Sequence, residues 1–197
     1  MKKSILILMV IGLAVISSCK KAQTLTQISL ELRLKDTADK AVSGVAIKLY
    51  ASETDWKNGS NQIGTTQISD TFGKVKFNDL SNIKYYWFAE KDCQNNMNGV
   101  FTTAVALIAN VDYTIPVFLA GTGILKFVNT SGNPYRIFIN GTDSFDMNGG
   151  TTQNTYYKPT VAYALRVLQL SGYAVSPIDS TYRGTLTCGS TLITSFP

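Results

Sequence analysis

Strict alternation of apolar and polar residues, first seen in residues 28–35, is the pattern that most narrows the folds open to this chain. In that segment Ile28 and three leucines would point to one side of an extended backbone, and polar side chains to the other. A period of two predicts a strand with one buried face. The alternation returns in residues 45–50, after the polar turn 36–41, and no convincing amphipathic helix follows residue 18. The chain is therefore predicted to be all-β.

Turn-forming residues divide the chain into many short strand candidates. Seven strands are expected first, over residues 28–35, 45–50, 62–69, 75–77, 85–89, 100–109 and 113–119. Pro116 would place the last of these at a sheet edge or a bulge. Further strands are expected over residues 124–128, 135–139, 161–170, 185–188 and 192–196. Because Gly121-Thr122-Gly123 separates the two groups, we expect two small β-sandwich domains in tandem, residues 25–120 and 121–197.

Two segments of the first region carry a family resemblance. AVSGVAIKLY (residues 41–50) and SDTFGKVKF (residues 69–77), followed by an aromatic strand, resemble the transthyretin-like (prealbumin) sandwich of carboxypeptidase regulatory domains and collagen-adhesin B repeats. The resemblance implies a sandwich of about seven strands. In the second region, NTSGNPYRIFINGT (residues 129–142) resembles a PEGA-type small β domain. These motifs specify hairpins and core packing, so they imply a fold and do not indicate a function.

The N-terminus has the features of an export signal. Two lysines precede an apolar run over residues 5–16, which is too short to span the roughly 30 Å of hydrocarbon in a bilayer. The run leads into Ile-Ser-Ser-Cys at residues 16–19, which resembles the lipobox of bacterial, Bacteroidetes-type lipoproteins. The resemblance implies that residues 1–18 are a signal peptide and that Cys19 is acylated with palmitate-type lipid. An ordinary secretory signal followed by a chance cysteine is the alternative.

An acylated Cys19 would make the lipid bilayer the first partner of this protein. Residues 19–24 would be the tether, and at about 3.5 Å per residue they hold the folded part within roughly 20 Å of the anchor. Lys20 and Lys21 would face anionic headgroups, and the acidic residues typical of surface-export signals are missing there. We therefore expect a cell-envelope protein anchored in the outer membrane, on the periplasmic face rather than the cell surface.

The chain contains no histidine, which excludes several kinds of catalytic and metal site. Zinc sites with imidazole ligands, Ser-His-Asp triads and Cys-His pairs all require it. Without the two N-terminal lysines, 16 Lys and Arg remain against 13 Asp and Glu, and no basic stripe supports a nucleic-acid partner. Asp143, Asp146 and Asn148 depart from the spacing of a calcium loop and are typical of a polar hairpin tip. We expect no enzyme, no cofactor and no metal.

Two cysteines remain when Cys19 is assigned to lipid. In an oxidising compartment Cys93 and Cys188 could form a disulfide, which would close a loop of about 95 residues and stabilise the fold by about 4 to 5 kcal/mol. Two buried free thiols are the alternative, because the sequence gives no distance between them.

Four consecutive aromatic residues begin at Tyr85. On one strand Tyr85 and Trp87 would occupy one face, and Tyr86 and Phe88 the opposite face. Only one face can line a sandwich core, so the other pair needs cover from the second domain, a loop, a partner protein or a stacked sugar ring. Trp56, in a segment expected to be a polar loop, is the third candidate for ligand contact. Its alternative role is a cap on the end of the sandwich.

These features favour a non-catalytic binding or structural role at the envelope, as an adhesion or glycan-binding accessory module. An accessory lipoprotein of an envelope-spanning secretion assembly, contacting a protein partner, is the alternative. An exposed aromatic patch would favour the glycan binder, and an uncovered strand edge or a flat apolar surface the assembly component. If the aromatic residues near Trp56 and those on the strand that begins at Tyr85 are both buried, a spacer is favoured.

Overall fold

The computed structural model describes residues 27–197, and the all-β prediction is confirmed for this part of the chain. Its first strands are β1 (Ile28–Lys35), β2 (Ala46–Tyr50), β3 (Ile63–Ile68), β4 (Lys74–Leu80), β5 (Tyr86–Lys91), β6 (Gln94–Asn95) and β7 (Asp112–Phe118), with one short helix, α1 (Glu53–Asn58). The remaining strands are β8 (Ala120–Asn129), β9 (Tyr135–Ile139), β10 (Asp143–Met147), β11 (Thr152–Pro159), β12 (Ala162–Gln169), β13 (Asp179–Thr185) and β14 (Thr191–Phe196). Among the described residues, no helix is long and apolar enough to cross a membrane.

The first sandwich, formed by β1–β7, packs the sheet β4-β1-β7 against the strands β3-β2-β5-β6. The alternation that predicts β1 sends Leu30, Leu32 and Leu34 into the core, where each is at most 1 % exposed. Trp87 of β5 meets them from the opposite sheet and is fully buried. Among the described strands β7 pairs only with β1, in parallel, so Pro116 lies on an edge strand where no second described strand needs its missing N–H.

The second sandwich, formed by β8–β14, packs the sheet β10-β9-β12-β13 against β11, β8 and β14. Its separate apolar core is centred on Phe127, Tyr135, Ile137 and Val167, all 0 % exposed. β14 pairs in parallel with β8, which places the last strand inside this domain.

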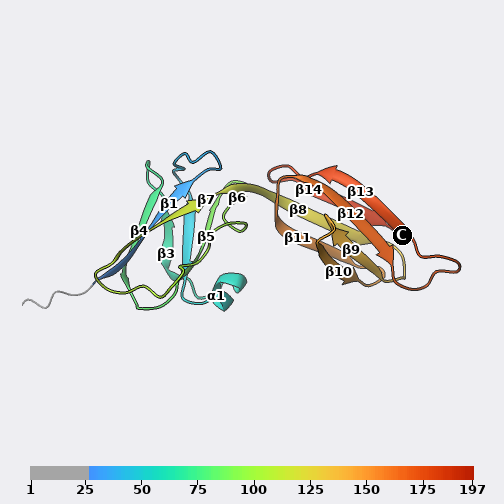
Figure 1. Ribbon diagram of the computed structural model, residues 1–197, viewed down its shortest axis with the longest axis horizontal. Helices are drawn as coiled ribbons and strands as arrows, with labels where there is room; N and C mark the ends of the chain where they lie inside the picture. The colour runs from blue at the N-terminus through green and yellow to red at the C-terminus, as the bar shows by residue number, and fades with distance from the viewer. Residues whose placement is uncertain (1–26) are drawn as a thin grey trace, which may run out of the picture.

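β8 belongs to both sandwiches. Its first residues, Ala120 and Gly121, pair with β6 of the first sandwich, while the rest of the strand pairs with β11 and β14 of the second. Figure 1 shows the strand running from one body into the other. The boundary expected between residues 120 and 121 therefore falls inside a continuous strand.

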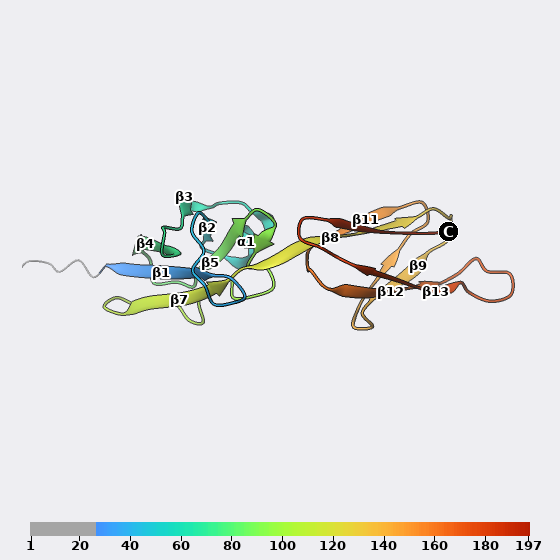
Figure 2. The same ribbon diagram turned by 90° about the horizontal axis from the view of Figure 1, so that it is seen from above.

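The two sandwiches lie end to end. In Figure 1 and Figure 2, β1 begins at the end of the molecule away from the second sandwich, and the loop between β12 and β13 projects at the other end. The C-terminus lies in the second half, beyond the middle of the molecule (Figure 2).

Three local expectations are wrong. The strand expected over residues 185–188 is absent: Thr185 ends β13, and the chain then turns before β14 begins at Thr191. Residues 100–109 form a loop in which Thr102 makes one isolated bridge to Tyr86, because the segment turns inward to bury Leu107 instead of continuing a ladder. The segment expected to be a polar loop around Trp56 contains α1.

Candidate functional site at the domain junction

The outer face of β2 and β5 forms the floor of the candidate site. The core takes Tyr85 and Trp87, so Phe88 projects from the opposite face and is only partly buried. In the antiparallel register Lys48 lies directly across from Phe88. Tyr50, two residues along the same face, is 2 % exposed although it lies outside the core of the first sandwich.

The short helix α1 forms one wall of the site. Ser52 caps its N-terminus by accepting a hydrogen bond from the Asp55 backbone N–H at 3.1 Å, and Gly59 ends it in the left-handed conformation at φ 63°. Asp55 in turn accepts hydrogen bonds from the Ser52 hydroxyl at 2.6 Å and from Asn61 Nδ2 at 2.6 Å. These contacts lower the pKa of Asp55, the Ser52 bond most, and keep the carboxylate charged at the end of the helix.

Two contacts fix the indole ring of Trp56, a hydrogen bond and a stacked aromatic ring. The ring nitrogen donates to the Trp87 carbonyl at 3.1 Å, and the ring stacks on Phe101 with centroids 4.4 Å apart and planes 5° from parallel. The helix therefore holds this side chain against the sheet, with part of its surface still exposed.

Tyr157 forms the opposite wall and comes from the second sandwich. A bulge between Thr155 and Lys158 interrupts the pairing of β11 with β8, and within it Tyr157 has φ 55°. A bulge changes the direction of a side chain, and here the phenol ring lies 5.6 Å from the ring of Phe88. Asn98 Nδ2 also donates to the Tyr157 carbonyl at 3.0 Å, so this left-handed backbone is held by contacts from the first sandwich.

These walls enclose a pocket of about 370 Å³ at the junction. Its lining combines aromatic rings, a thioether and two ammonium groups, with no carboxylate: Lys48, Tyr50, Trp56, Lys57, Asn58, Gly59, Phe88, Met97 and Tyr157. Lys57 pairs with Glu53 one turn earlier on α1, whereas Lys48 makes no ion pair within the described residues. Burial, and then the carboxylate of Glu90, raise the pKa of Tyr50, so its hydroxyl stays protonated and can donate.

The structure brings together two of the three aromatic residues proposed from the sequence. Trp56 and Phe88 line the pocket, and Tyr86 does not. Sequence reasoning missed Lys48 as a member of the site, and for Tyr156 and Tyr157 it raised only the question of what would cover the face opposite the core. The two consecutive tyrosines, Tyr156 and Tyr157, can be seen in the sequence. The bulge that turns Tyr157 toward Phe88 cannot, because it depends on how β11 pairs with β8. Cys19, the expected lipidation residue, lies outside the described residues.

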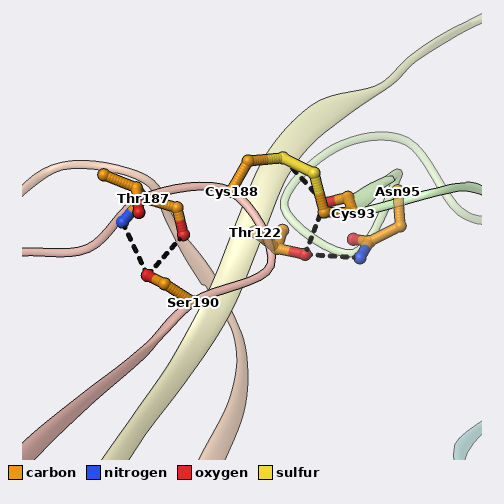
Figure 3. The surroundings of a disulfide bond; sticks show 6 residues. All are labelled: Cys93, Asn95, Thr122, Thr187, Cys188 and Ser190. Carbon is orange, nitrogen blue, oxygen red and sulfur yellow. Dashed lines mark hydrogen bonds between the residues drawn. A yellow bond between two sulfur atoms is a disulfide. The ribbon is translucent and has the colours of Figure 1, made fainter.

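A disulfide joins Cys93 and Cys188 beside the junction, with 5.5 Å between their Cα atoms. Cys93 lies between β5 and β6 in the first sandwich, and Cys188 lies just before β14 in the second (Figure 3). Next to it Thr122 of β8 accepts from Asn95 Nδ2 at 2.7 Å and donates to the Cys93 carbonyl at 3.2 Å. A disulfide and hydrogen bonds therefore cross between the sandwiches beside β8.

Asp143 and Asp146 were expected at a hairpin tip, but both lie within strand β10, where each has a basic partner. Asp146 receives two hydrogen bonds from Arg136, at 2.7 and 2.9 Å, and Asp143 lies 3.4 Å from Lys158. Within residues 27–197, no group of three or more His, Cys, Asp or Glu side chains is placed to hold a metal ion.

No protein-family model and no curated protein matches the chain. Among solved structures, it is similar to a streptococcal ancillary pilin, with a TM-score of 0.40, 14 % identity, and coverage of 87 % of this chain and 63 % of that one. It is similar to the TIE protein of Bacillus anthracis, with a TM-score of 0.36, 14 % identity, and coverage of 86 % and 34 %. It is also similar to the minor pilin GBS52 of Streptococcus agalactiae, with a TM-score of 0.32, 15 % identity, and coverage of 85 % and 94 %.

The chain thus spans less than two thirds of the length of the first two of these proteins. At TM-scores of this size the likeness carries no argument about function.

Proposed function

We propose that this protein is a membrane-anchored, non-catalytic binding module of the cell envelope that takes a short glycan into the pocket at the domain junction. The observation that carries the proposal is the lining of that pocket. Aromatic faces stack on the apolar faces of sugar rings, and Trp56, Phe88 and Tyr157 line the pocket from three different elements.

The charge of the lining favours an acidic glycan. Both charged side chains in the pocket are lysines, and Lys48 makes no ion pair among residues 27–197. A carboxylate on the ligand would therefore find an ammonium donor beside the aromatic rings. Tyr50 adds a hydroxyl that stays neutral over the physiological pH range.

Binding is tested with an array of neutral and uronic-acid oligosaccharides, followed by calorimetric titration of the tightest oligosaccharide. Tyr157→Asn removes the ring while retaining a residue type that accepts a positive φ. We expect it to weaken binding about tenfold, the effect of losing about 1.4 kcal/mol of stacking. Tyr156→Asn is the matched control, because Tyr156 is the neighbouring tyrosine and does not line the pocket. Equal affinities for the two variants would contradict the proposal.

Anchoring is tested separately by growing cells with labelled palmitate. We expect label in the natural chain and none after Cys19→Ser, which should also release the protein from the membrane fraction. An unlabelled natural chain would remove the anchor from the proposal while leaving the pocket untouched.

A second function, contact with a protein partner in an envelope assembly, is favoured by the edge strand β3. It pairs only with β2 among the described strands, and five of its six residues are exposed. An open edge of this kind can accept an added strand. Partner capture through β3 would persist in Tyr157→Asn, which separates the two functions.

A further inference from the structure

Four exposed apolar side chains gather on two loops at one end of the molecule. Ile83 lies in the loop between β4 and β5, and Val105, Ile108 and Val111 lie in the loop that leads to β7. Their exposed fractions are 37, 60, 50 and 41 %. We call these four residues the end patch.

The end patch surrounds the point where the described chain begins. Val111 directly precedes Asp112, which pairs with Ser29 near the start of β1. Ile28 pairs with Leu80, immediately before the loop that holds Ile83. Figure 1 and Figure 2 both show the loop leading to β7 next to the start of β1, at the end away from the second sandwich.

Both loops are held by hydrogen bonds, and one of them also by a buried side chain. The Leu107 backbone N–H donates to the Ile83 carbonyl at 3.0 Å, and the Leu107 side chain is fully buried in the core. The Tyr113 hydroxyl accepts from the Ile108 backbone N–H at 3.0 Å. The apolar side chains are therefore presented outward from an ordered backbone.

We infer that the end patch rests in the interfacial region of the lipid bilayer that holds the acyl group of Cys19. The inference depends on the proposed anchoring. Nine backbone steps lead from Cys19 to Ile28, so at about 3.5 Å per step the start of β1 lies within about 32 Å of Cys19. A surface with exposed apolar side chains that is tethered so closely to a membrane gains free energy by burying them among headgroups and upper acyl chains.

The charged side chains near the end patch are consistent with insertion as far as the headgroups and upper acyl chains, and not with insertion into the middle of the bilayer. Lys84 is exposed next to Ile83 and can reach phosphate groups. Asp112, also exposed, would remain at the level of the headgroups, and Asp79 accepts a hydrogen bond from Gln27 Nε2 at 2.8 Å. In this orientation the long axis points away from the membrane, and the junction pocket faces the space beyond the first sandwich.

The test uses the acylated full-length mature protein, reconstituted in vesicles of phosphatidylethanolamine and phosphatidylglycerol with brominated acyl chains. Bromine quenches tryptophan that reaches the acyl region. A tryptophan is introduced by Val105→Trp in the end patch or, as the control, by Val175→Trp in the loop between β12 and β13 at the opposite end. Val105 is 60 % exposed and Val175 is 95 % exposed, so both sites accept the larger ring at the surface. The signal of the unaltered protein, which contains Trp56 and Trp87, is subtracted.

We expect strong quenching of the tryptophan at position 105 and none at position 175. Equal quenching at the two positions, or none at 105 in protein that carries the acyl group by mass spectrometry and floats with the vesicles, would overturn the inference and leave the anchoring intact. Protein without an acyl group that fails to float would overturn both.

Discussion

At the scale of single residues, the junction pocket depends on side chains whose positions are set by polar contacts outside it. Trp56 faces the sheet because α1 exists, and α1 is only six residues long. A helix this short has little stability of its own, so its caps and its contacts with the sheet must hold it. Asp55 is central to that arrangement, since it accepts from Ser52 and Asn61 at 2.6 Å each.

We predict that the pKa of Asp55 lies below its ordinary value of 3.8 and rises toward it when Asn61 loses its side chain. Asn61→Gly is the suitable change, because Asn61 has φ 51° and glycine accepts that conformation. The carboxyl pKa is read from carbon-detected NMR across an acid titration. Ser60→Ala is the control and should move the pKa less, since the Ser60 hydroxyl is 3.4 Å from the carboxylate.

The sign of the pH dependence follows from that shift. A carboxyl whose pKa is lower in the folded state stabilises the fold at pH values above its unfolded pKa. This stabilisation is lost as the pH falls through the folded pKa, so α1 should loosen in acid before the rest of the first sandwich. A pKa of Asp55 at or above 3.8 in the natural chain would contradict this account.

At the scale of elements, the second sandwich depends on close approach of backbones along β8. Gly123 has no room for a side chain, because a Cβ there would lie 2.7 Å from the Ser190 carbonyl and 2.9 Å from Leu186. The neighbouring strand β14 begins directly after this contact and pairs with β8 from Ile124 onward.

We therefore predict that Gly123→Ala destabilises the protein by about 1 to 3 kcal/mol, the usual range for forcing extra volume into a packed site. The free energy of unfolding is measured by urea denaturation. Gly132→Ala is the control, since a Cβ at that position meets nothing within 4 Å and it should be nearly neutral. A neutral Gly123→Ala would show that β14 can shift away from β8 at little cost.

The elements that could be predicted from the sequence are those whose signal is local. The alternation in β1 and the two faces of β5 both follow from a period of two, and the structure has Trp87 inside and Phe88 outside. The helix α1 was missed because six residues are too few for a helical period to be seen. The bulge at Tyr157 was missed because it arises from the pairing of β11 with β8, which no local pattern encodes.

At the scale of the whole molecule, the Cys93–Cys188 disulfide links the two sandwiches across 95 residues of chain. A cross-link of that span restricts the unfolded chain, and on the chain-entropy model it contributes about 4 to 5 kcal/mol. In the folded state β8 already joins the same two bodies through continuous pairing. The disulfide therefore stabilises the protein mainly by restricting the unfolded chain, whereas β8 joins the two sandwiches in the folded state.

We predict that the double change Cys93→Ser and Cys188→Ser lowers the free energy of unfolding by several kcal/mol, about 4 on that model, without changing the dimensions of the folded protein. Urea denaturation measures the first quantity and small-angle X-ray scattering the second. The natural chain under the same conditions is the reference. A larger radius of gyration in the folded double variant would mean that the bridge, rather than β8, fixes the two sandwiches relative to each other.

A strand shared by two bodies, with a disulfide beside it, opposes rotation of one body against the other. Rotating one sandwich against the other would break the pairing of β6 with β8 and separate Tyr157 from Phe88. The junction pocket is therefore formed before a ligand binds. Binding needs no domain closure and costs little conformational entropy, so the affinity of a ligand should depend mainly on how well its shape and charge match the pocket.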